Sequence, residues 1–185
     1  MTDSGDDPRQ PTRGRAQDPG GDQPLMTFSE RPQPNFALDP FHKVLLAVSM
    51  IAAVVLPVYF FLRSFGAQGD FALHYDFTGD VTREGSLQEA AVILVLLSLL
   101  TIGCGVLTRY PRIFNFSVTL TRENVQRQHK NAVQMLVWIV AGMAAILAIM
   151  VGGWLGILSV DLMWLPLATM GIILIVFIRR MIKLR

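Results

Sequence analysis

A short run between two apolar segments holds the side chains best suited to chemistry: His74, Asp76 and Asp80, with Gly79 between the two acids. Imidazole and carboxylate groups bind metal ions or small ligands and exchange protons. Residues 71–78 alternate between apolar and polar types, which is typical of an extended segment and would place His74 and Asp76 on one face about 7 Å apart. Thr78-Gly79-Asp80 has the composition of a turn, which would let Asp80 fold back toward that face.

Two interpretations of this run stay open. Either His74, Asp76, Gly79 and Asp80 form a binding motif, or their polar face only hydrogen-bonds the loop to the helix ends beneath it. A zinc site needs three or four closely spaced ligands, and one histidine with two acids falls short of that, so we expect no metal. No nucleophile accompanies the acids, and no phosphate-binding loop or dinucleotide fingerprint occurs. We therefore expect no catalytic residues, no cofactor, no nucleic-acid partner and no enzyme activity.

The segments that must position this motif are strongly apolar. The chain is 52% hydrophobic and 16% charged, and its lone Cys104 excludes an internal disulfide. Four stretches contain no Asp, Glu, Lys or Arg: residues 44–62, 90–107, 132–155 and 162–178. Each approaches the roughly 20 residues that cross a bilayer, and each is apolar on nearly every face, unlike a helix of a soluble bundle. The sequence predicts an all-α polytopic membrane protein with a four-helix transmembrane domain over residues 43–180.

Local signals refine these helices. Ser86 followed three residues later by Glu89 predicts a capping box at the start of the second helix. The polar run through Lys130 is expected to continue without a break into the third helix. Gly152, Gly153 and Gly156 leave room only for a tight turn, so the third and fourth helices should be antiparallel neighbours.

Basic residues indicate the orientation, because loops rich in them stay in the cytoplasm. Of the 16 Lys and Arg residues, only Arg63 and Arg83 fall in the first and third connections of a four-pass topology. The loop at 109–130 and the residues after 178 are basic. We therefore expect a multi-pass protein of the cell (plasma) membrane with both termini in the cytoplasm and the His74 loop outside.

The two ends of the chain are polar. Residues 1–42 are rich in proline, glycine and charge, which predicts a disordered arm. No apolar signal-peptide core precedes Val44, so the first helix should act as an uncleaved signal anchor. Residues 181–185, with Arg179 and Arg180 before them, form a basic tail suited to anionic lipid headgroups. Besides the lipid bilayer, a homo-oligomer or another membrane protein stays open as a partner.

The His74 loop also resembles a known family. The run His74-Tyr75-Asp76-Phe77-Thr78-Gly79, followed by Gly85-Ser86 and preceded by Leu56-Pro57, is similar to a signature of the bacterial membrane family of unknown function numbered 1648, which is related to the SdpI-type immunity proteins. Tyr110-Pro111, Phe114-Asn115 and Thr121-x-Glu123-Asn124 resemble its second motif. The resemblance covers about residues 44–155 and implies a membrane protein without known catalysis, associated in its longer members with toxin immunity and signalling.

These observations predict a non-enzymatic membrane protein that senses or binds an extracytoplasmic factor through the His74 loop. A small transporter or channel subunit is the alternative. No ionisable residue lies deep in any apolar segment. This argues against the transporter, because ion-coupled transport usually requires such a residue.

Overall fold

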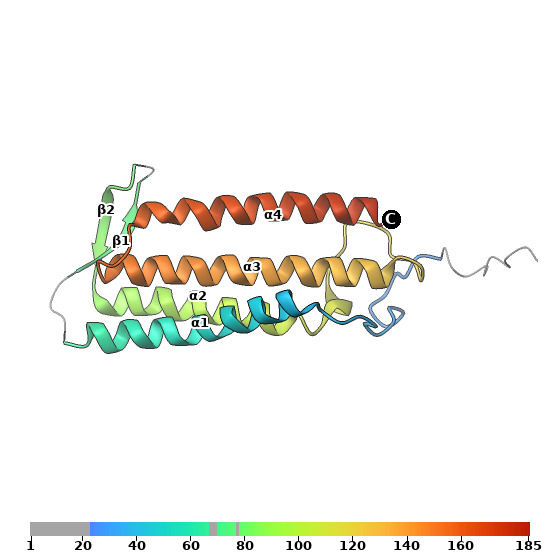
Figure 1. Ribbon diagram of the computed structural model, residues 1–185, viewed down its shortest axis with the longest axis horizontal. Coiled ribbons are helices and arrows are strands. Elements are labelled where there is room, and N and C mark those ends of the chain that lie inside the picture. Colours follow the sequence, from blue (N-terminus) through green and yellow to red (C-terminus); the bar gives the residue numbers. More distant parts are fainter. Residues whose placement is uncertain (1–22, 67–69, 77) are drawn as a thin grey trace, which may run out of the picture.

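A computed structural model of the 185-residue chain describes residues 23–66, 70–76 and 78–185. Four long helices, α1 (Pro40–Ser64), α2 (Leu87–Leu107), α3 (Val125–Trp154) and α4 (Trp164–Lys183), run side by side (Figure 1). A hairpin of β1 (Phe71–Tyr75) and β2 (Val81–Gly85) lies at one end, together with the short helix η2 (Val160–Met163). We call this the hairpin end. Residues 23–39, the short helix η1 (Pro111–Ile113) and the chain's C-terminus lie at the other, the terminal end.

All four long helices are long and apolar enough to cross a membrane, and the one around α4 includes η2. The predicted spans therefore correspond one to one to helices, and each helix extends beyond its apolar stretch. The α3 helix begins at Val125, which confirms that the polar run before residue 132 continues into the third span. The α4 helix reaches Lys183, so most of the predicted basic tail is helical.

Helix ends follow the local signals. Ser86 caps α2, and its backbone N–H donates to Glu89 Oε2 at 2.9 Å, completing the predicted capping box. Asp39 caps α1, accepting a hydrogen bond from the backbone N–H of His42. The α3–α4 connection is the predicted tight turn: Gly156 adopts a φ of +69°, and the N–H of Ile157 donates to the Gly152 carbonyl at 2.7 Å.

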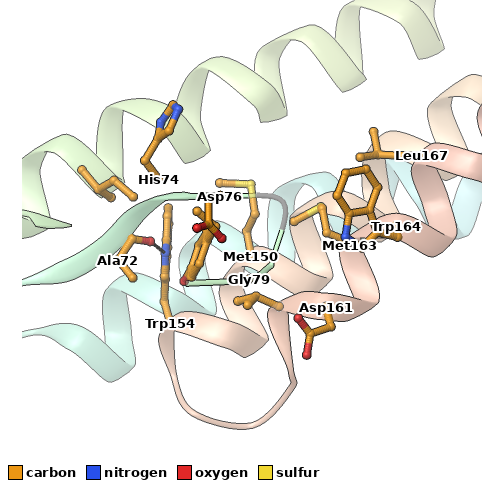
Figure 2. A pocket seen from close by; sticks show the side chains of 13 residues that line it. Ala72, His74, Asp76, Gly79, Met150, Trp154, Asp161, Met163, Trp164 and Leu167 are labelled. Atoms are coloured by element: carbon orange, nitrogen blue, oxygen red, sulfur yellow. Dashed lines mark hydrogen bonds between the residues drawn. The ribbon is translucent and has the colours of Figure 1, made fainter. Parts of the chain in front are cut away.

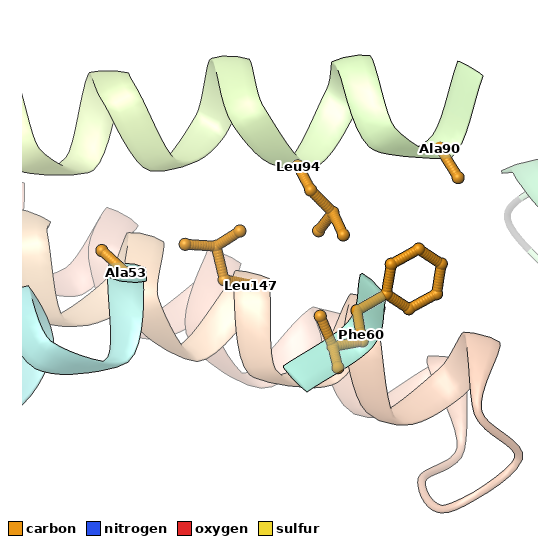
Figure 3. Packing of buried hydrophobic residues seen from close by; sticks show 6 residues of the cluster. Ala53, Phe60, Ala90, Leu94 and Leu147 are labelled. Carbon is orange, nitrogen blue, oxygen red and sulfur yellow. The ribbon is translucent and has the colours of Figure 1, made fainter. Parts of the chain in front are cut away.

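The core lies between α1, α2 and α3 near the hairpin end. Ala53 and Phe60 from α1, Ala90 and Leu94 from α2, and Leu147 from α3 are all 0–1% exposed and face one another (Figure 3). Half of the apolar window of α3 is buried, against 11% for that of α4. The α3 helix is therefore central, and α4 packs on the outside of it.

Polar side chains of α3 fasten the neighbouring helices at the terminal end. Gln128 Nε2 donates to the carbonyl of Met181 at 2.9 Å, and Asn131 Nδ2 donates to that of Phe177 at 3.1 Å. The Met181 carbonyl lies in the last turn of α4, where helix carbonyls lack a partner within the helix. These bonds satisfy backbone groups and join α4 to α3 where the apolar middle of the bundle ends.

Residues 23–39, which the sequence assigns to the disordered arm at 1–42, contact the terminal end, and α1 already begins at Pro40. Pro24 bridges to Thr121, and the N–H of Leu25 donates to the Leu120 carbonyl at 2.8 Å. Gln126 bonds the backbone of Gln33 and Asn35. Backbone and side-chain hydrogen bonds thus connect residues 23–39 to the bundle in this structure, and the disorder of the arm stays a prediction. Residues 1–22 lie outside the described residues.

One close approach holds α4 on α3. A Cβ added to Gly142 of α3 would collide with the Met170 side chain of α4, whereas one added to Gly171 would meet nothing within 4 Å. We expect Gly142→Ala to lower the free energy of unfolding by about 1–3 kcal/mol through overpacking. Gly171→Ala should leave it unchanged or raise it, because alanine favours the helix. Thermal unfolding in detergent measures both, and equal effects of the two substitutions would contradict this packing.

Candidate functional site

The predicted motif lies at the hairpin end, beside the α3–α4 turn. A cavity of about 370 Å³ opens between the two. On the hairpin side it is lined by Ala72, Leu73, His74, Tyr75, Asp76 and Gly79, and on the other side by Met150, Trp154, Val160, Asp161, Met163, Trp164 and Leu167. Figure 2 shows the hairpin residues facing residues at the end of α3, in η2 and at the start of α4.

A tryptophan fixes the hairpin on the bundle. The Trp154 indole Nε1 donates to the carbonyl of Ala72 in β1 at 2.6 Å. Its ring packs against Phe60 and Phe71, with centroids 5.3 and 6.2 Å away. The indole thus supplies both apolar contact and a directional hydrogen bond. This contact sets the distance between β1 and α3, and with it the width of the cavity.

The β-hairpin is irregular at His74. β1 and β2 pair antiparallel, Phe71 opposite Gly85 and Tyr75 opposite Val81, with register shifts on both sides of His74. The strand ends at Tyr75, so Asp76 belongs to the turn and not to an extended face shared with His74. His74 is exposed, whereas its neighbours Leu73 and Tyr75 are partly buried. The expected alternation in exposure therefore holds from Leu73 to Asp76 but not at Ala72, which is partly buried. Phe77 lies outside the described residues.

Asp76 organises the turn that Thr78-Gly79-Asp80 predicts. Its Oδ1 accepts hydrogen bonds from the Thr78 N–H at 2.9 Å, the Thr78 hydroxyl at 2.7 Å and the Asp80 N–H at 2.9 Å. Asp80 does fold back, because its Oδ2 accepts a second bond from the Thr78 hydroxyl at 3.1 Å. These bonds occupy the turn's own donors, as in an Asx turn. Asp80 does not line the cavity, whereas His74, Asp76 and Gly79 do.

Gly79 brings the turn against η2. It has a φ of +92°, which favours glycine, and a Cβ there would lie 2.6 Å from Asp161 Oδ1. Asp161 itself accepts a hydrogen bond from the Ser159 hydroxyl at 2.9 Å. The close approach at Gly79 brings the turn of Asp76 beside the carboxylate of Asp161.

Asp161, Trp154 and Trp164 are the site residues that sequence reasoning missed. The signal for Asp161 was present, because a four-pass topology puts the loop between the third and fourth helices at the same end as the His74 loop. The two tryptophans carried no comparable signal, since aromatic residues near span ends are common in membrane proteins.

The arrangement suits ligand binding. Its lining is largely apolar, with two tryptophans and two methionines, and includes the acidic side chains of Asp76 and Asp161, as in many small-molecule sites. Within the described ranges, no group of three or more His, Cys, Asp or Glu side chains is arranged to hold a metal ion. Burial raises the pKa of Tyr75, so its phenol stays protonated at neutral pH. The cavity can therefore offer carboxylates, aromatic faces and one hydroxyl.

Comparison of the chain with protein-family models, with curated proteins and with solved structures finds no match.

Acid should loosen the turn at the cavity. Hydrogen bonds from the Thr78 hydroxyl, and then from backbone N–H groups, lower the pKa of Asp76 below its ordinary value. A lowered folded pKa means that these bonds contribute fully above the ordinary value and are lost as the pH falls through the folded one. We expect the fluorescence of Trp154 and Trp164 to change below about pH 4, measured in a Trp138→Phe background.

Asp76→Asn supplies the control for this titration, because it keeps an acceptor oxygen without a titrating group. The acid transition should disappear in that variant. A transition that persists unchanged would assign it to another carboxylate.

Proposed function

We propose that this chain is a multi-pass protein of the cell membrane whose hairpin end faces outward and binds an extracytoplasmic ligand in the cavity between β1 and the α3–α4 turn. The observation that carries the proposal is the cavity itself, with Trp154 and Trp164 on its apolar side and the carboxylates of Asp76 and Asp161 at its edge. Among the described residues, no group of three or more His, Cys, Asp or Glu side chains is arranged to hold a metal ion. Binding, rather than catalysis, is the activity that we infer.

The chemistry of the lining favours a ligand with an apolar body and a positive charge. Indole faces attract cations, and carboxylates add Coulombic attraction. A volume of about 370 Å³ suits a small molecule or one or two side chains of a peptide. A role in signalling or immunity, as the resemblance to the family numbered 1648 implies, would follow from ligand binding at this end.

The alternative, a small transporter or channel subunit, has less support. The packed side chains of Ala53, Leu94 and Leu147 fill the core between α1, α2 and α3. The Gln and Asn side chains of α3 lie in its first turns, where Gln128 and Asn131 bond α4. A pathway would require those helices to part, and flux of ions or solutes in reconstituted vesicles would reveal it.

Orientation is tested with cysteines. In a Cys104→Ser background, Thr78→Cys marks the turn of the hairpin and Lys183→Cys marks the end of α4. We expect a membrane-impermeant maleimide to label Thr78→Cys on intact cells and Lys183→Cys only after permeabilisation, because basic segments stay inside. The reverse pattern would invert the topology and remove the extracytoplasmic ligand.

Ligand binding is tested with a small aromatic cation. Benzyltrimethylammonium should quench the fluorescence of Trp154 and Trp164 in the purified Trp138→Phe chain, and neutral benzyl alcohol should do so more weakly. The double variant Asp76→Asn, Asp161→Asn should weaken the cation's binding about tenfold, because two attractive charges are lost.

Asp80→Asn is the matched control, since Asp80 belongs to the same turn and does not line the cavity. Its affinity should stay within about twofold of the wild type. Equal losses in Asp80→Asn and the double variant would show a general charge effect and contradict a site in the cavity.

A further inference from the structure

At the terminal end, Arg31 and Arg112 form a crossed pair: each donates hydrogen bonds to backbone carbonyls in the segment that contains the other. Arg31 Nη1 donates to the carbonyls of Arg112 and Phe114, both at 2.7 Å. Arg112 Nη2 donates in return to the carbonyls of Phe28 and Ser29, at 3.1 and 3.3 Å. The Arg31 guanidinium also lies over the Phe28 ring, 4.7 Å from its centroid. This crossed pair joins residues 28–31 to the loop that follows α2.

The crossed pair carries two positive charges, and no carboxylate of the described residues forms an ion pair with either arginine. Among the described residues, the ion pairs are His42–Asp39 and the contact of Arg83 with Glu89, both elsewhere. The Nε atoms of Arg31 and Arg112 are buried and bond nothing in the described part of the chain. Burial lowers the pKa of Arg31, which expresses the cost of holding this cation away from water. A nearby anion would offset that cost.

A cavity of about 520 Å³ lies beside the crossed pair and offers room for an anion. One wall is formed by Phe28, Ser29, Gln33 and Pro34, and the other by Arg109, Tyr110, Pro111, Arg112 and Ile113. The lining thus contains two guanidinium groups, hydroxyl and amide groups, and no Asp or Glu. Guanidinium groups bind phosphate oxygens with paired, charge-assisted hydrogen bonds.

The position of the cavity relative to the membrane indicates which phosphate-containing ligand it binds. It begins two residues after α2 leaves its apolar span at Leu107, which is the level of lipid headgroups. Tyr110 and Ile113, which line it, are 57% and 54% exposed, and a tyrosine at this level is typical of the membrane interface. A lipid whose acyl chains lie along α2 would bring its headgroup to Arg109 and Arg112.

We propose that this cavity binds the phosphate of an anionic phospholipid headgroup. The site is built from the loop after α2 and residues 28–34, and is separate from the basic residues of α4. Lipid bound there would bridge the two segments that Arg31 and Arg112 already join. Occupancy would therefore fix residues 28–34 on the bundle and place the phosphate against Arg109 and Arg112, the two arginines that line the cavity.

The experiment measures lipid binding to the full purified chain in a neutral detergent. Phosphatidylglycerol is titrated by native mass spectrometry against phosphatidylcholine with the same acyl chains. Wild-type protein should prefer phosphatidylglycerol by about tenfold, and Arg109→Gln should remove most of that preference. Arg109 is substituted because its side chain, unlike that of Arg112, holds no backbone carbonyl among the described residues. Arg112→Gln should lower the preference as well.

Arg122→Gln is the matched control, because it removes one arginine from the same end of the bundle without touching the cavity. The preference should be retained in it. Equal losses in Arg109→Gln and Arg122→Gln would overturn the site in favour of diffuse surface charge. Inorganic phosphate is the remaining arm: if it displaces phosphatidylglycerol at equal concentration, the cavity takes free phosphate and the lipid assignment is wrong.

Discussion

The hydrocarbon interior of a membrane offers no hydrogen-bond partner to a polar group. This constraint determines where polar and apolar side chains lie in the bundle. Backbone groups must be satisfied within helices, and ionisable side chains must lie at the ends. The middle of the bundle accordingly contains Ala53, Leu94 and Leu147, while hydrogen-bonding side chains gather at both ends of α3. Non-helical structure in this bundle is therefore expected only outside the membrane, at the hairpin end and the terminal end. Both candidate sites lie there, one formed by the β-hairpin and the other by the segments around η1.

The α3 helix is apolar in its middle and forms hydrogen bonds to neighbouring elements near both of its ends. Trp154 near its last turn holds the hairpin through the Ala72 carbonyl, and Gln128 and Asn131 near its first turns hold α4 through backbone carbonyls. Gln134 Nε2 lies 3.3 Å from Asp39 Oδ2, where α1 begins. His42 bonds the Asp39 carboxylate and lowers its pKa to about 2, which keeps that helix cap ionised. Polar groups near the two ends of α3 thus contact α4, the cap of α1 and strand β1.

The sequence predicts those features that depend on neighbouring residues alone. Length and the absence of charge predict the four spans, Ser86 and Glu89 predict the cap of α2, and Thr78-Gly79-Asp80 predicts a turn. Features set by distant contacts are not visible in it. The register shifts around His74 depend on pairing with β2, and the role of Trp154 depends on a carbonyl 82 residues away. The composition of residues 23–39 predicts disorder. It does not show that Arg31 and Arg112 donate to backbone carbonyls at this end, because any residue can supply such a carbonyl.

The attachment of α4 determines how the two ends can influence each other. Among the described elements α4 packs chiefly on α3 and η2, and the Met170 side chain of α4 lies where a Cβ on Gly142 of α3 would be. A ligand wedged between Trp154 and Trp164 would press the start of α4 away from α3. Because the helix is stiff, movement about this close approach would carry its last turns the other way, toward the carbonyl contacts of Gln128 and Asn131. Those hydrogen bonds are directional and resist such movement, so binding of the proposed ligand at the hairpin end would be thermodynamically linked to the strength of these bonds.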